Sequence, residues 1–116
     1  MIPTGPGLSE KNCKPCKNIP PMSNAEAEQY LLTLPKWALK GNAIEREFRF
    51  KSYIMGLNFG YQVGRVAEQQ DHHPEILVGW RRVVLTLTTH SIQGLSENDF
   101  IMAAKANKVY CEFGSQ

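Results

Sequence analysis

The chain has 116 residues, of which 42% are hydrophobic and 21% charged, and this composition is typical of one globular domain. Its formal net charge of +2 comes from interspersed charges, so the sequence lacks the dense basic stripe of most nucleic-acid-binding proteins, and we expect no nucleic acid partner. No run approaches the roughly 18 consecutive apolar residues of a membrane span, so no membrane association is expected.

The first 21 residues are expected to form an extended arm, because they hold five of the seven prolines. They have neither the basic start nor the apolar run of a signal peptide, and the three cysteines of the chain are an odd number. These features predict a reducing, cytoplasmic setting. Residues 22–116 are then expected to form a single domain.

A first helix is predicted over residues 25–32. Ser23 or Asn24 can cap it, and acidic residues occupy its first turn, where the helix dipole favours them. Pro35 is expected to stop it.

Residues 37–39 and 44–51 are predicted to pair as a hairpin, with Gly41 and Asn42 in the turn. In the second strand, apolar and charged residues alternate with the period of a half-buried strand. The apolar side chains that share one face are Ile44, Phe48 and Phe50.

Ser52 can cap a long helix that continues to about Gln70, in which larger apolar residues recur at helical spacing. Gly56, Gly60 and Gly64 lie four residues apart on one face. Each costs up to about 1 kcal/mol relative to alanine in a helix. The row indicates either close packing against a sheet or another subunit, or simply an imperfect helix.

A turn at residues 71–74 precedes β-branched runs at residues 76–78 and 82–89, which we expect to form a second hairpin around Gly79 and Trp80. Ser96 and Asp99 have the spacing of a capping box for a last helix, which is predicted to extend through Lys105. The order α-β-β-α-β-β-α predicts an α+β fold, a four-stranded antiparallel sheet with its helices on one face.

All three histidines, His72, His73 and His90, fall within nineteen residues. Each lies between predicted elements, where turns could bring them to one end of the sheet. Imidazole and imidazolium are both available near pH 7, so the cluster favours proton transfer. Neighbours in extended backbone point to opposite sides, so we expect different tasks for His72 and His73. A single histidine on its own would more simply be a structural or surface residue.

A catalytic zinc held by three histidines is a less favoured alternative, because two of them are adjacent and no His-Glu-x-x-His pattern occurs. Cys13 and Cys16 form a Cys-x-x-Cys motif, which is half a zinc site or a redox pair. The motif lies in a proline-rich arm and has no second pair, so an inert or locally structural role is favoured.

Residues 68–99 resemble the signature of the pterin-4a-carbinolamine dehydratases. The signature reads Glu, three residues, His-His-Pro, five residues, Trp, nine residues, His, eight residues and Asp, from Glu68 to Asp99. The resemblance extends over roughly residues 22–108 and includes Trp37. The Cys-x-x-Cys arm is similar to that of the bacterial and plant branch of the family.

The resemblance implies an oligomer, dimeric or tetrameric, that needs no metal or organic cofactor. It implies dehydration of 4a-hydroxytetrahydropterin to quinonoid dihydropterin, a step that recycles the cofactor of aromatic amino acid hydroxylation. In the alternative, the same fold serves as a non-catalytic binding or assembly protein or as a transcriptional dimerisation cofactor. Histidine residues intact at all signature positions favour the enzyme.

By the same resemblance, all three histidines are catalytic: His73 and His90 are the expected acid and base, and His72 lies against the substrate hydroxyl and can share the proton transfer. Glu68 and Asp99 are expected to orient the histidines or the substrate. Ile76 replaces an aromatic residue of animal members, so any stacking there passes to Trp37 or Trp80. The further residues expected to line the pterin pocket are Asp71, Thr88, Thr89 and Ser91.

Overall fold

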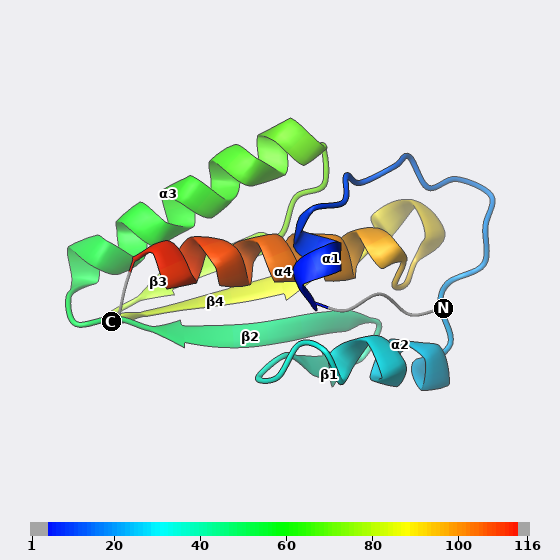
Figure 1. Ribbon diagram of the computed structural model, residues 1–116, viewed down its shortest axis with the longest axis horizontal. Coiled ribbons are helices and arrows are strands. Elements are labelled where there is room, and N and C mark those ends of the chain that lie inside the picture. Colours follow the sequence, from blue (N-terminus) through cyan, green and yellow to red (C-terminus); the bar gives the residue numbers. More distant parts are fainter. Residues whose placement is uncertain (1–4, 114–116) are drawn as a thin grey trace.

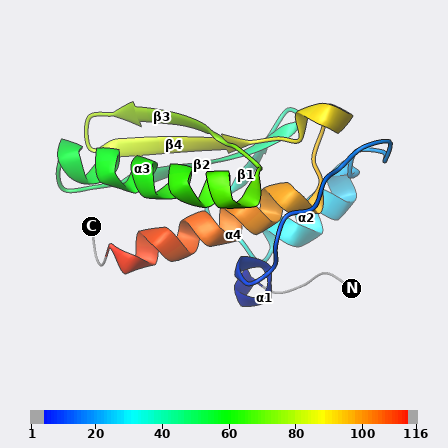
Figure 2. The same cartoon turned by 90° about the horizontal axis from the view of Figure 1, so that it is seen from above.

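The computed structural model describes residues 5–113 and confirms the predicted α+β fold (Figure 1). Four antiparallel strands form one sheet in the order β1-β2-β4-β3. The strands are β1 (Ala38–Lys40), β2 (Ala43–Arg49), β3 (Glu75–Gly79) and β4 (Arg82–Leu87). Figure 2 shows the two long helices lying together on one side of this sheet. They are α3 (Tyr53–Gln70) and α4 (Glu97–Glu112).

The first hairpin has the predicted turn. Lys40 pairs with Ala43, and Gly41 adopts a φ of 63°, which glycine tolerates without steric cost. The second hairpin is shifted by one residue from the prediction, because Gly79 still pairs with Arg82 and the turn falls on Trp80 and Arg81.

Strand β4 is shorter than predicted. It ends at Leu87, and Thr89 then forms only an isolated bridge with Gly94. The chain continues into a short 3-10 helix, η1 (His90–Ile92). The segment with the third histidine is therefore a turn at the sheet's end.

Helix caps are largely as predicted. Ser23 caps α2 (Asn24–Leu31) and Ser52 caps α3 by accepting hydrogen bonds from backbone N–H groups in the first turn. Helix α4 has the predicted capping box but continues past Lys105 to Glu112. Helix α2 ends at Leu31, before Pro35, so this proline follows the end of the helix and does not set it.

The core lies between the sheet and the helices and is rich in aromatic side chains. Phe48, Phe59 and Phe100 are fully buried in it. Arg46 has the same parity on β2 as Phe48, and its guanidinium group stacks 4.1 Å from the Phe48 ring centroid. Burial lowers the pKa of Arg46. Its Nη1 donates a hydrogen bond to Asn107, so this inward charge is partly compensated.

Two of the three glycines in the α3 row pack against the sheet. A Cβ atom added at Gly56 or Gly60 would stand 3.4 Å from a methyl group of Val83 or Ile76 respectively. At Gly64 an added Cβ would meet nothing within 4 Å. Close helix–sheet packing therefore accounts for the first two positions and not for the third.

The N-terminal arm departs from the predicted extended conformation at its start. Gly5–Ser9 form a short helix, α1, and Leu8 is fully buried in the core. Lys105 on α4 donates a hydrogen bond to the Ser9 carbonyl. Burial of one leucine and contact with α4 therefore order a segment whose prolines had predicted an open arm. Residues 1–4 of the arm and 114–116 of the domain lie outside the described residues.

Within residues 5–113, no helix has both the length and the apolar character that crossing a bilayer would require.

A buried tyrosine links α2 to α4. The Tyr30 hydroxyl donates a 3.0 Å hydrogen bond to Glu97, which also pairs with Lys11 of the arm at 2.9 Å. Burial and the bond to Glu97 raise the pKa of Tyr30 to about 12 from its ordinary 10.0. For Glu97, burial opposes ionisation, but the hydrogen bonds from Lys11 and Tyr30 outweigh it and lower the pKa.

We therefore expect stability to fall as the pH rises from about 10 to about 12. In that window the unfolded chain ionises its tyrosine while folded Tyr30 stays protonated, so unfolding becomes more favourable by up to about 2 kcal/mol. Urea unfolding at several pH values should show the free-energy advantage of wild type over Tyr30→Phe shrinking through this window. The exposed Tyr61→Phe is the control; an advantage that stays constant with pH would contradict the prediction.

Candidate active site

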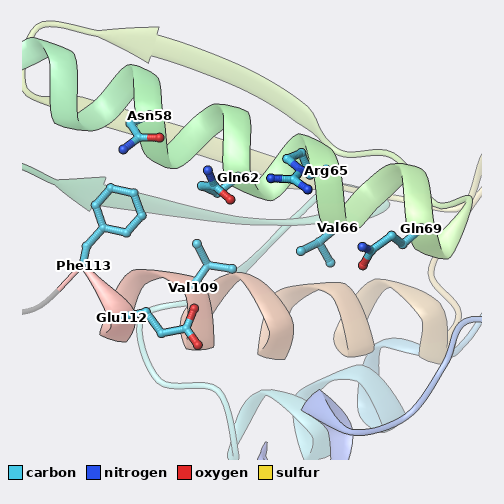
Figure 3. Close-up of a pocket in the computed structure, with 8 residues that line it drawn as sticks. All are labelled: Asn58, Gln62, Arg65, Val66, Gln69, Val109, Glu112 and Phe113. Carbon is cyan, nitrogen blue, oxygen red and sulfur yellow. The ribbon is translucent and has the colours of Figure 1, made fainter.

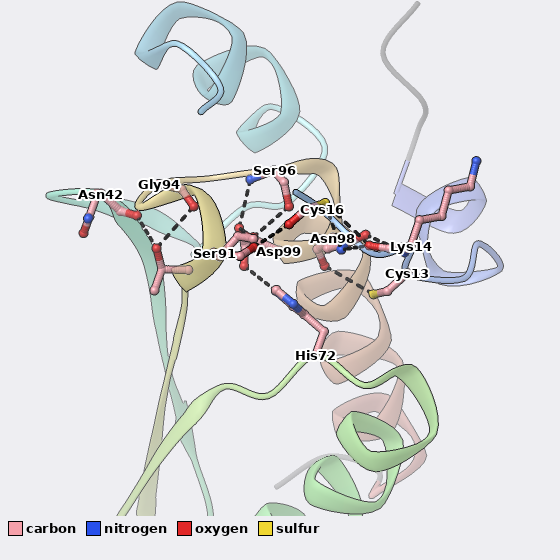
Figure 4. A network of polar contacts seen from close by, with 12 residues as sticks. Cys13, Lys14, Cys16, Asn42, His72, Ser91, Gly94, Ser96, Asn98 and Asp99 are labelled. Carbon is pink, nitrogen blue, oxygen red and sulfur yellow. Dashed lines mark hydrogen bonds and ion pairs between the residues drawn. The ribbon is translucent and has the colours of Figure 1, made fainter. Parts of the chain in front are cut away.

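The end of α3 directs His72 into the protein. Asp71 caps the helix in the left-handed conformation, with a φ of 52°, and its N–H donates to the Ala67 carbonyl. Aspartate tolerates this conformation better than most residues. The next residue, His72, then places its Nε2 atom 2.6 Å from Oδ1 of Asp99 in the first turn of α4 (Figure 4).

Asp99 is the buried centre of a polar network. Its side chain is fully buried, and its second oxygen, Oδ2, accepts hydrogen bonds from the Thr89 hydroxyl at 2.8 Å and the Ser96 N–H at 3.0 Å. Asp99 therefore caps α4 as predicted and also contacts His72, while its role toward a substrate stays a prediction. With Asp99 ionised, Nε2 of His72 carries the proton of the shared bond, which leaves Nδ1 as the nitrogen able to accept one.

His73 and His90 line a second part of the site together. Their common cavity has a volume of about 230 Å³. His73 Nε2 also lies 2.5 Å from Oε2 of Glu68 on the last turn of α3. The Thr88 hydroxyl, which donates to the Asn42 carbonyl at 2.7 Å, stands in the same cavity. The remaining lining residues are Asn42, Ala43, Pro74, Glu75 and Thr86.

A separate cavity, also of about 230 Å³, contains His72. Asp71, Thr89 and Ser91 line it as well. Residues 88–91 alternate between the two cavities, and in the other segment the change of cavity falls between His72 and His73. The two adjacent histidines therefore have different surroundings, and their different tasks stay a prediction.

Both tryptophans lie away from the histidines. Trp37 is 5% exposed, packs edge-on against Phe48, and donates from its indole N–H to Asn107 at 2.9 Å. Core packing and this bond explain why it does not line either cavity. Trp80 is 70% exposed at the β3–β4 turn and stacks with Arg81.

Sequence reasoning missed the contribution of the arm. Residues 13–16 line the His72 cavity together with Gln70 and Asn98. The Ser91 hydroxyl donates a 2.5 Å hydrogen bond to the Cys16 carbonyl, so this predicted pocket residue holds the arm. The only signal in the sequence was the unexplained Cys-x-x-Cys motif, whose spacing says nothing about where it docks.

Another cavity of the protein involves neither the histidines nor the arm. A cavity of about 420 Å³ lies between α3 and α4 and is bordered by Arg65 and Glu112 (Figure 3).

Across the part of the chain that the structure describes, three or more His, Cys, Asp or Glu side chains nowhere gather closely enough to hold a metal ion.

Comparison with known proteins agrees with this architecture. Residues 20–109 match the family model for pterin 4 alpha carbinolamine dehydratase. The homologue from Methylococcus capsulatus named for this activity is 44% identical over 108 residues, covering 90% of this chain and 95% of its own. That from Halorhodospira halophila is 45% identical over 103 residues, covering 86% and 94%.

A crystal structure described as a transcriptional coactivator/pterin dehydratase from Brucella melitensis has the same fold. It superposes with a TM-score of 0.72 at 37% sequence identity and covers 77% of this chain and 97% of its own. Sequence and fold thus agree over most of the chain. The chain belongs to the pterin-4-alpha-carbinolamine dehydratase family.

Proposed function

We propose that this protein dehydrates 4a-hydroxytetrahydropterin to quinonoid dihydropterin by histidine acid–base catalysis. The observation that carries the proposal is the shared cavity of His73 and His90. Two imidazoles that border one small space can act on two atoms of one substrate. Family membership indicates the reaction, and the cavity contains the two imidazoles that would transfer protons.

The reaction requires one proton to be delivered and one to be removed. The 4a-hydroxyl leaves as water only after it gains a proton, and a ring nitrogen loses its proton as the new double bond forms. One of His73 and His90 would act as the acid and the other as the base, and each would then be ready for the next turnover after a proton exchange with solvent. Glu68, bonded to His73 Nε2, orients that ring.

His72 is assigned to positioning. Asp99 fixes its ring through the 2.6 Å bond, and the Thr89 and Ser96 donors hold Asp99 in turn. Such a chain holds a histidine in one tautomer, as in other Asp–His pairs. Of the residues 71–73 and 88–91, His73, Thr88 and His90 border the cavity proposed for the substrate, and the others line the neighbouring cavity.

The size of the cavities suits a small flat ring. Pockets for drug-sized ligands measure about 300–1,000 Å³, whereas the cavity beside His73 and His90 is about 230 Å³. The Thr88 hydroxyl and nearby backbone groups offer the few polar contacts that orient a ligand in such a site.

The test follows the ultraviolet absorbance of freshly generated 4a-hydroxytetrahydropterin with and without purified protein. We expect the dehydration rate to rise in proportion to protein concentration above the spontaneous rate. A rate that stays at the spontaneous value would overturn the proposal. It would favour the non-catalytic binding function, which is supported by the coactivator description of the Brucella structure.

We also propose that the protein is a homo-oligomer. Helix α3 exposes Ile54 and Tyr61 at 68% and 65%, and the neighbouring edge strand β3 exposes Leu77 at 58%. Among the described residues β3 pairs only with β4, so its outer backbone groups are open to another strand. A second copy offers the same apolar side chains and the same edge, which makes it a complementary partner.

In analytical ultracentrifugation, wild type should sediment as a dimer or tetramer. The double change Ile54→Glu with Tyr61→Glu should lower the sedimenting mass, from tetramer to dimer or from dimer to monomer, because each substitution adds a charge to the apolar contact. Gln62→Glu with Gln69→Glu adds the same two charges elsewhere on α3 and should leave the mass unchanged. A monomeric wild type would refute this assembly.

A further inference from the structure

The Cys-x-x-Cys motif lies beside the candidate site and has no part in the proposed chemistry. The arm that carries it is fixed at both ends. Leu8 is buried near its start, and the Met22 N–H donates to the Leu95 carbonyl at 2.8 Å beyond its end. Between these points the arm crosses the first turn of α4 (Figure 4).

Asn98 holds the middle of the arm. Its Oδ1 accepts from the Lys14 N–H at 3.0 Å, and its Nδ2 donates to the Lys14 carbonyl at 2.6 Å. The Cys13 N–H donates separately to Gln70 at 2.7 Å. These bonds make residues 13–16 one wall of the cavity that contains His72.

Both sulfur atoms take part in the same attachment. The Cys13 thiol donates to the Asn98 carbonyl over 3.7 Å, and Asn98 Nδ2 lies 3.3 Å from the sulfur of Cys16. Asn98 therefore holds the two cysteines at its backbone and at its side chain respectively. A disulfide between them would remove the S–H donor of Cys13.

Closing a disulfide would change the contacts of both sulfur atoms. Both cysteines are free in the docked arm, and each sulfur has its own contact with Asn98. A disulfide brings the two sulfurs to about 2 Å from each other. We therefore expect bond closure to draw the sulfurs away from Asn98 and to loosen the attachment of the Lys14 peptide.

We propose that Cys13 and Cys16 form a reversible disulfide with a low-molecular-weight disulfide as oxidant, and that its formation releases residues 13–16 from Asn98 and opens the His72 cavity. Disulfides of cytosolic proteins are mostly transient and serve catalysis or redox sensing. This inference concerns the arm alone and stands independently of the proposed enzymatic reaction.

The chemistry proceeds by two thiol–disulfide exchanges. The Cys16 thiolate attacks one sulfur of oxidised glutathione, forms a mixed disulfide and releases one glutathione thiolate. The Cys13 thiolate then attacks the Cys16 sulfur, forms the intramolecular bond and releases the second. Two cysteine thiols are oxidised, one glutathione disulfide is reduced, and the two thiol protons pass to the released thiolates.

The surroundings of the two sulfurs favour this order. Asn98 Nδ2 donates toward the Cys16 sulfur, whereas the Cys13 thiol is itself the donor to the Asn98 carbonyl. Burial raises the pKa of the Cys13 thiol to about 11, which keeps it protonated while the arm is docked. Cys13 becomes a competent nucleophile only as the arm loosens, so bond formation and release are coupled.

The experiment uses the full chain carrying Cys111→Ser, so that the pair holds the only thiols. After treatment with oxidised glutathione, thiol titration and intact mass should show loss of both thiols without a glutathione adduct. Hydrogen exchange at the Cys13 and Lys14 amides should accelerate by about tenfold or more, because both lose their acceptors. Dithiothreitol should restore slow exchange.

The matched control adds Cys16→Ser, which cannot close the intramolecular bond. After the same treatment it should keep slow exchange at both amides. Intact mass must first show that Cys13 carries no mixed disulfide. Either of two results would overturn the proposal. One is a complete disulfide between Cys13 and Cys16 with unchanged exchange at both amides. The other is retention of both thiols in millimolar oxidised glutathione. Neither readout depends on dehydratase activity.

Discussion

Replacing His73 or His90 by alanine is expected to lower dehydration by about 10²- to 10⁴-fold in each variant, which is the range of general acid–base catalysis. The two imidazoles border one cavity, and each would handle a different proton of the reaction. Both lie on the surface, with 53% of the His73 side chain exposed, so neither truncation removes core packing. The fold is therefore expected to persist.

The measurement is the initial dehydration rate at saturating substrate, with circular dichroism and urea unfolding as checks on the fold. Lys51→Ala, an exposed change beyond the opposite end of β2, serves as the matched control and should retain wild-type turnover. Wild-type rates in both histidine variants would contradict the assigned roles. Loss in only one would assign both proton transfers to that residue.

Replacing Asp99 by asparagine should cost about 1–3 kcal/mol of folding free energy, because hydrogen bonds to a buried carboxylate are replaced by weaker neutral ones. Asp99 accepts from His72 on one oxygen and from Thr89 and Ser96 on the other. The asparagine NH₂ group must face one of these donors. We expect the NH₂ group to face His72, because the imidazole can change tautomer and accept a hydrogen bond there. Because the tautomer of His72 then differs from that in wild type, turnover should fall as well.

Urea unfolding measures the first effect, and ¹⁵N chemical shifts of the His72 ring report its tautomer. Asp71→Asn is the matched control, since Asp71 borders the same cavity but caps α3 through its backbone, and asparagine also tolerates the left-handed conformation. It should leave both readouts near those of wild type. An Asp99→Asn protein with unchanged stability and tautomer would show that the buried network does not hold His72.

Local signals predicted most of the fold. Ser52 as a cap and the Ser96–Asp99 capping box depend on residues three positions apart, and both are present. The alternation on β2 likewise follows from the chain's own period. The second turn was misplaced because Gly79 suggested a turn, whereas Arg81 adopts the positive φ of 59° that the two-residue loop requires.

The sequence predicted only those parts of the candidate site that belong to the signature. His73 and His90 meet because β4 returns beside β3, which the hairpin pattern already indicated. The docking of the arm depends on contacts between distant residues, such as Cys13 with Gln70 and Lys14 with Asn98, which no local period encodes. The burial of Trp37 on Phe48 is likewise a tertiary outcome.

The most direct test of positioned histidine catalysis compares this protein with free imidazole as a catalyst of 4a-hydroxytetrahydropterin dehydration. Imidazole is supplied at three times the protein's molar concentration, matching the three histidines of the chain. Because orientation in a site raises the effective concentration of a catalytic group by orders of magnitude, the protein should be far faster at equal imidazole content. A rate no greater than that of free imidazole would contradict the account.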